Sequence, residues 1–225
     1  MVGDTDIEIE MDIESLLREG LEDEVTLFRL GGHLANLLLR KLEFPLGAVH
    51  VSVSAVDVDV IFSGFADQMR ESRVAVSVSC YWNKFIPSAR KTLPNFLPDI
   101  APVFHQFHES DVGAVDHLVA LSSTSREAAV VVENLRRTAA RFRAPSQIAL
   151  LPTASADDLL DLMNHANYRQ APIPSIYLGI NSGNEWSPSL ADMGWGCDKE
   201  DSPHQFGMPE TLKPLLQQQI LSLGP

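Results

Sequence analysis

The sequence predicts an α/β fold: a mainly parallel central sheet flanked by helices on both faces. Strand-like apolar runs alternate with helical patterns, most regularly between Val112 and Ile180, and that order is typical of βαβ units. The 225 residues, 45% hydrophobic and 21% charged, are enough for one sizeable core. We therefore expect one α/β domain over 25–180, preceded by an acidic segment at 1–24 and followed by a loop-rich segment at 181–225.

Two amphipathic helices are expected before the first strand. In the first, over 7–21, isoleucines and leucines recur at helical spacing, so one side of the helix is apolar. The second, over 27–42, carries a leucine stripe and ends shortly before Pro45, as helices commonly do. Gly31 and Gly32 lie inside this second helix, where glycine weakens helix propensity.

The remaining elements follow from the same two periodicities. Apolar alternation over 49–53 and 56–62 predicts either one long strand or a bulged pair. A short helix or turn follows at 66–72. Further strands are expected over 74–81, 103–107 (at a sheet edge), 112–119, 148–151 and 176–180, and further helices over 124–141, 155–167 and 210–221.

The chain is acidic, and its acids are concentrated near the start. The net charge is −13, and residues 4–24 hold ten acids against the single base Arg18. Tight binding to nucleic acid depends on clustered Lys and Arg, so we expect no nucleic-acid partner. The acidic segment is either a solvated face leading into a helix or a docking segment for a basic protein partner. A homo-oligomer is the other open possibility.

Signals for location are few. No apolar run reaches the ~18 residues of a membrane span, and no basic and apolar leader stands at the acidic start, so no membrane partner is expected. Two cysteines, Cys80 and Cys197, are too few for a disulfide scaffold, which favours a cytoplasmic location. Cys80 is expected to be a buried, inert thiol.

Residues 112–129 have a pattern with chemical meaning. We expect an apolar strand with Asp116 at its carboxyl end, then a loop of small residues, then a helix. Thr124 and Glu127 have the spacing of a capping box. The free N–H groups and the dipole of such a helix start attract a phosphate-like anion, at the sheet edge where ligands bind. Alternatively, Asp116 and Thr124 only terminate and cap these elements.

This stretch resembles the phosphoribosyl-pyrophosphate loop of type I phosphoribosyltransferases, in which four apolar residues and two acids precede Thr-Gly-x-Thr at a helix start. Asp116 matches the first acid, and Thr124 matches the closing threonine. The sequence departs from the family pattern at two places. His117 stands where the second acid belongs, and Leu121-Ser122 stands where Thr-Gly belongs. Serine allows the backbone to wrap around a phosphate less easily than glycine does.

The resemblance implies a phosphoribosyltransferase-like fold and a phosphorylated small-molecule ligand, phosphoribosyl or nucleotide, bound with Mg²⁺. The implied reaction is a displacement at the anomeric carbon, helped by positioning and charge stabilisation. Asp116 would be the catalytic group, holding the ribose hydroxyls, and no residue is assigned as a metal ligand. The remaining ligand contacts would come from His117, Ser122, Ser123, Thr124 and, at the pyrophosphate, Lys91.

Two other classes of function stay open. The same fold could act as a binding or regulatory module without catalysis, which the departures at His117 and Leu121 favour. Alternatively, the chain is a non-catalytic interaction or assembly protein acting through its acidic start and apolar surfaces. Histidines and acids also gather between His105 and His117, but without the His-Glu-x-x-His spacing of zinc proteases. A polar rim is therefore expected there rather than a metal site.

Overall fold

The computed structural model describes residues 4–19, 23–42, 47–84, 86, 88, 100–109, 113–123, 128–142, 146–152, 154, 156–170, 174–177 and 208–222. Within these residues, one six-stranded sheet has the order β3-β2-β1-β4-β5-β6. Only β3 runs antiparallel to its neighbour there, and the other described pairs are parallel. The strands are β1 (Ala48–Ser54), β2 (Ala75–Asn83), β3 (Val103–His108), β4 (His117–Leu121), β5 (Ser146–Leu150) and β6 (Ser175–Tyr177).

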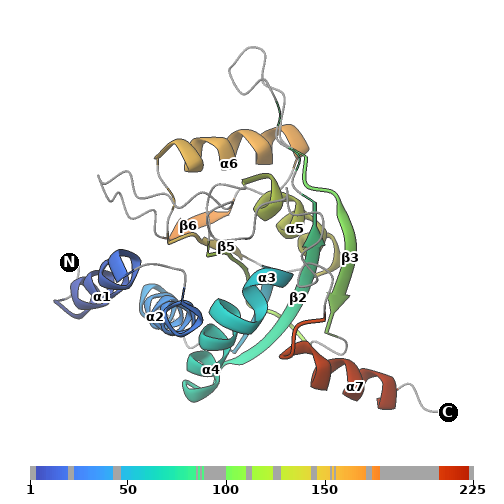
Figure 1. The fold of residues 1–225 in the computed structure, drawn as a ribbon, viewed down its shortest axis with the longest axis horizontal. Helices are drawn as coiled ribbons and strands as arrows, with labels where there is room; N and C mark the ends of the chain where they lie inside the picture. The colour runs from blue at the N-terminus through green and yellow to red at the C-terminus, as the bar shows by residue number, and fades with distance from the viewer. Residues whose placement is uncertain are drawn as a thin grey trace.

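Helices cover both faces of the sheet (Figure 1). One layer contains α1 (Asp4–Glu19), α2 (Glu24–Lys41) and the continuous helical segment α3 (Ala55–Asp57), η1 (Val58–Phe62) and α4 (Ser63–Glu71). The other layer contains α5 (Ala128–Arg141) and α6 (Ala156–Arg169). The last helix, α7 (Leu212–Ser222), joins the core of the first layer through Leu212. The coarse prediction of an α/β fold with a mostly parallel sheet is confirmed.

The two faces of the central strands differ in polarity. On β1, Val49, Val51 and Val53 belong to the core that includes α2 and α4. The alternate residues, such as His50 and Ser52, lie on the α5 side and are buried although they are polar. Because side chains alternate along a strand, the same alternation places the serines of β2 on the α5 side. The strands β1 and β2 are therefore apolar towards α2 and polar towards α5, whereas β4 and β5 also present apolar residues to α5.

The acidic start of the chain is ordered against its own domain. In α1, Ile9, Ile13 and Leu16 are buried in the same core cluster as α2 and the sheet. The helix predicted over 7–21 is therefore confirmed, and its apolar stripe packs inward as its spacing indicated. No helix in the described part of the chain is both long and apolar enough to cross a bilayer.

The strand predicted over 56–62 is wrong, because this segment is helical and includes the π-helix η1. β1 and β2 are parallel neighbours, so the chain between them has to return from one end of the sheet to the other, usually through a helix. The buried positions Val58, Ile61 and Phe65 have helical spacing. That longer pattern outweighs the local alternation of β-branched residues from which the strand was predicted.

The strand predicted over 112–119 is displaced: β4 begins at His117 and ends at Leu121. This shift matters for function, because it moves Asp116 from the carboxyl end of the strand to its amino end. The strands predicted over 49–53, 74–81, 103–107 and 148–151 are confirmed to within a few residues, as are the helices at 27–42, 66–72, 155–167 and 210–221. For the strand predicted over 176–180, the structure describes β6 (Ser175–Tyr177), and 178–180 lie outside the described residues.

Candidate functional site at the carboxyl edge

The direction of the strand order reverses between β1 and β4. The chain leaves β1 through η1 and α4 to reach β2 on one side, and leaves β4 through α5 to reach β5 on the other. In open α/β sheets, ligands bind outside the carboxyl ends of the strands where the order reverses in this way. Ser54, at the end of β1, and Leu121, at the end of β4, mark this edge.

A buried carboxyl group lies at this edge. Asp57, three residues beyond β1, has only 1% of its surface exposed. Its Oδ1 atom accepts a hydrogen bond from the Ser123 hydroxyl at 2.6 Å, and its Oδ2 atom accepts one from the Ser123 backbone N–H at 3.3 Å. Ser122 also donates a side-chain hydrogen bond to this carboxyl. Asp57 therefore anchors the loop that follows β4 to the short helix α3 that follows β1.

The surroundings of Asp57 favour its neutral form. Burial raises its pKa from 3.8 to about 6, although the hydrogen bonds from Ser123 and Ser122 act in the opposite direction. Burial is the larger effect, because an ionised carboxylate loses its hydration there. Burial and the nearby acids Asp59 and Asp57 also raise the pKa of the Cys80 thiol, and the predicted burial of this cysteine is confirmed.

Removing the Asp57 carboxyl is expected to lower stability. The variant Asp57→Ala leaves the buried donors of Ser123 without their acceptor, which costs about 2 kcal/mol. Chemical denaturation of Asp57→Ala, Ser123→Ala and the double variant measures this coupling. We expect the double variant to lose less than the sum of the two single losses. Strictly additive losses would show that the contact contributes nothing.

The structure separates the residues that the sequence assigned to one loop. Asp116 precedes β4, and its Oδ2 atom accepts hydrogen bonds from the backbone N–H groups of Gly47 and Ala48, both at 2.9 Å. These two bonds hold the pKa of Asp116 below its usual range. The five residues of β4 lie between Asp116 and Ser122, which places the two about 20 Å apart along the strand. The expectation that Asp116 and these serines form one ligand loop is therefore wrong.

The other predicted site residues divide in the same way. His117 lies beside Asp116 at the amino edge and is hydrogen-bonded to Ser146, and burial lowers its pKa. Ser122 and Ser123 lie at the carboxyl edge and are buried. Thr124 and Lys91, with the proposed capping box, lie outside the described residues. Only Ser122 and Ser123 are therefore placed where the sheet order favours a ligand.

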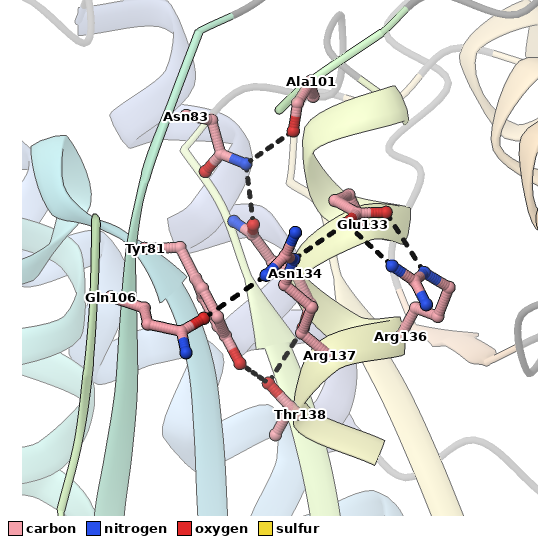
Figure 2. Close-up of polar contacts among 9 residues, drawn as sticks. All are labelled: Tyr81, Asn83, Ala101, Gln106, Glu133, Asn134, Arg136, Arg137 and Thr138. Atoms are coloured by element: carbon pink, nitrogen blue, oxygen red, sulfur yellow. Dashed lines mark hydrogen bonds and ion pairs between the residues drawn. The ribbon is translucent and has the colours of Figure 1, made fainter. Parts of the chain in front are cut away.

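A second group of polar side chains, which the sequence reading missed, lies between α5 and the sheet. We refer to it as the polar seam. It consists of α5-facing residues of the three strands and of polar residues of α5: His50 and Ser52 of β1, Ser77, Ser79, Tyr81 and Asn83 of β2, Gln106 and His108 of β3, and Asn134, Arg137, Thr138 and Arg141 of α5. The Tyr81 hydroxyl is hydrogen-bonded to the Thr138 hydroxyl at 2.8 Å, and the Asn83 amide donates a hydrogen bond to the Asn134 side-chain oxygen at 2.9 Å; Figure 2 draws both contacts. The signal was present in the sequence, because polar residues alternate with valines along both central strands.

A chain of histidines and serines continues the polar seam towards the amino edge. The two ring nitrogens of His50 lie 2.7 Å from the hydroxyls of Ser77 and Ser79, and Ser79 lies 2.7 Å from Nδ1 of His108. The pKa of His50 is lowered to about 3, mainly by burial and then by His108 and Arg141. The pKa of His108 is lowered to about 4, mainly by burial and then by Arg141 and Arg137. Both imidazoles are therefore neutral near pH 7.

Metal chemistry finds little support in the described residues. Among them, no group of three or more histidine, cysteine, aspartate or glutamate side chains gathers closely enough to hold a metal ion. The carboxylates of Asp57 and Asp116 are far apart, and each is already hydrogen-bonded by neighbouring groups. They do not fit the oxygen-rich coordination that Mg²⁺ requires.

Comparisons with known proteins add no assignment. No protein-family model matches the chain, and no curated protein matches it significantly. What the structure itself defines is the class: an α/β protein with a mostly parallel sheet.

Proposed function

We propose that this protein binds a small phosphorylated ligand, of the phosphoribosyl or nucleotide type, at the carboxyl edge between β1 and β4. One observation carries the proposal: the backbone N–H and the hydroxyl of Ser123 already bind an acidic group there, the Asp57 carboxyl. Donors that are directed at an acid and lie at the point of strand-order reversal suit a phosphate. Ser122 belongs to the same loop.

In this proposal Asp57, rather than Asp116, is the acid at the ligand site, and it competes with the ligand for Ser123 instead of binding the ligand. A phosphate that reaches Ser123 has to replace the Asp57 carboxyl, and an ionised Asp57 repels it. The pKa of Asp57 is raised to about 6, so the carboxyl is mostly ionised at pH 7 and its repulsion of a phosphate weakens as the pH falls below 6. Because the described acids do not fit Mg²⁺, the ion would accompany the ligand's pyrophosphate, and we propose binding without a transferase step.

The test is calorimetric titration of the full chain with phosphoribosyl pyrophosphate, with and without Mg²⁺. We expect Ser123→Ala to weaken binding about tenfold, the value of one charge-assisted hydrogen bond. Asp57→Asn removes the competing charge and is expected to bind at least as tightly as the unmodified protein. Asp116→Ala is the matched control at the opposite edge and is expected to leave the affinity unchanged.

The outcomes separate the alternatives. Loss of binding in Asp116→Ala with normal binding in Ser123→Ala would overturn the proposed site. No detectable binding at millimolar ligand would overturn the ligand class. The second candidate, an interaction protein, would then have the stronger support, since Met11, Val25 and Phe28 expose 62%, 64% and 41% of their surfaces on α1 and α2. Exposed apolar side chains of this size are typical of contact surfaces when they gather in a patch.

A further inference from the structure

One face of α5 is polar and directed at β2 and β3. Asn134, Arg137, Thr138 and Arg141 recur at intervals of three and four residues, so they lie on one side of the helix. Three of them have contacts in that direction: Asn134 with Asn83 of β2, Thr138 with Tyr81 of β2, and Arg137 with Gln106 of β3. Figure 2 shows these contacts running along the helix.

The register of these contacts places Arg141 beside His108. The Arg137 guanidinium reaches the Gln106 side-chain oxygen at 3.5 Å. From Arg137 to Arg141 the helix advances about 6 Å, and from Gln106 to His108 the strand advances about 7 Å. Both steps run towards the amino ends of the parallel strands. β3 is antiparallel to β2, and so is α5, because Asn134 contacts Asn83 while the later residue Thr138 contacts the earlier residue Tyr81. Arg141 on α5 therefore lies at the level of His108 on β3, just as Arg137 lies at the level of Gln106.

The part of the polar seam near Arg141 and His108 has more positive than negative charge. Glu133 binds the guanidinium groups of Arg136 at 2.9 Å and Arg137 at 2.8 Å. Arg141 is exposed, and within the described residues it has neither an ion pair nor a hydrogen bond. Two arginines therefore share the Glu133 carboxylate, and Arg141 adds a third positive charge without a carboxylate partner among the described residues. The lowered pKa of His108 and of His50 reflects this positive field as well as burial.

Polar groups of the polar seam also remain without partners. The Ser52 hydroxyl is buried, with 2% of the residue exposed, and finds no hydrogen-bond partner in the part of the chain that the structure describes. It lies on β1 opposite Ser79, which holds Nδ1 of His108. The Nε2 atom of His108 has no partner among the described residues. An unpartnered buried hydroxyl costs free energy, and such groups in native proteins are commonly satisfied by water or a ligand.

We propose that the polar seam binds a small phosphate-type oxyanion between α5 and β3, held by the Arg141 and Arg137 guanidinium groups and by Nε2 of His108. A guanidinium offers paired N–H donors that match phosphate oxygens. This site is distinct from the one at the carboxyl edge: it uses the middle and amino-terminal part of the sheet and none of Asp57, Ser122 or Ser123.

The test uses inorganic phosphate as the probe and the titration of His108, followed by NMR, as the readout. The groups facing His108 are Arg137 and Arg141 of α5, His50 of β1 and Ser79 and Tyr81 of β2. A bound anion stabilises the imidazolium, so 20 mM phosphate is expected to raise the pKa of His108 by about one unit relative to chloride of equal ionic strength. An acetate arm distinguishes a phosphate-type anion from a simple carboxylate.

Matched variants decide the result. Arg141→Ala is expected to abolish the phosphate-dependent shift of His108, whereas Arg136→Ala, which removes an equal charge paired with Glu133, is expected to keep it. Thermal melting of both variants verifies that they fold. Equal shifts in phosphate, acetate and chloride, or a shift that survives in Arg141→Ala, would overturn the proposal. Ser123→Ala is expected to keep the shift, so failure of the carboxyl-edge site and failure of this one are distinguishable.

Discussion

Replacing Gly31 by alanine is expected to destabilise the protein by about 3 kcal/mol or more, at the upper end for overpacking a core. Gly31 is buried in α2 where this helix crosses η1 and α4. A Cβ atom at Gly31 would overlap the Ile61 carbonyl oxygen and would lie 2.8 Å from the Phe65 nitrogen. Both are backbone atoms, so relief requires the helices to move apart rather than a side chain to rotate.

The neighbouring glycine provides the control. A Cβ atom at Gly32 would have its nearest contact at 3.9 Å, with the Gly64 carbonyl oxygen. Gly32→Ala is therefore expected to be neutral or to stabilise the helix by up to about 1 kcal/mol, the difference in helix propensity. Gly64→Ala, whose Cβ would overlap the Phe28 carbonyl oxygen, is expected to behave like Gly31→Ala. Urea denaturation of the three variants measures this, and equal stabilities for Gly31→Ala and Gly32→Ala would contradict the close approach.

Lowering the pH from 7 to 4 is expected to reduce the free energy of unfolding by about 3 kcal/mol. In the folded protein the pKa of His50 is about 3 and that of His108 about 4, against 6.5 for a free histidine. Between those values the unfolded chain binds more protons than the folded one, so stability falls as the pH falls below 6.5. The Ser77 and Ser79 hydroxyls that hold neutral His50 do not compensate an imidazolium in a buried site.

Asp57 acts in the opposite direction and is included in this net value. Its pKa is raised from 3.8 to about 6, so the stability that it contributes is complete below 3.8 and is lost as the pH rises through 6. Denaturation between pH 4 and 7 is expected to show a weaker pH dependence in His50→Gln and a stronger loss towards acid in Asp57→Asn. His33→Gln, at a partly exposed position of α2, is the control. A profile for His50→Gln that parallels the unmodified protein would contradict the neutral, buried His50.

The strong periodicities of the chain were sufficient to predict most of the elements. The leucine stripe of α2 fits only a helix, and the valine–serine alternation of β2 fits only a strand, because each pattern places its apolar residues on one face of the element. The apolar run at 56–62 was compatible with either a strand or a helix. Its valines alternate like those of a strand, and the helical pattern became visible only together with Phe65 and Met69, which are also buried.

The candidate site was predicted less well than the fold. The pattern from Asp116 to Ser123 suggested one loop, but a shift in the start of β4 placed its two ends at opposite edges of the sheet. Asp57 gave no signal, because it lies in a segment predicted to be a strand. The polar seam gave a signal in each strand separately, but nothing in the sequence indicated that α5 would cover those polar faces with Asn134, Arg137 and Thr138.

The sequence by itself determined the class of fold and, for strongly periodic elements such as α2 and β2, which face is apolar, since these follow from local periodicity and burial. Only the tertiary structure decided which polar groups meet. Asp57 and Ser123 are 66 residues apart, and His50 and Ser79 are 29 apart. Their contacts depend on strand order and register, which arise from packing of the whole sheet and are not specified by any one segment.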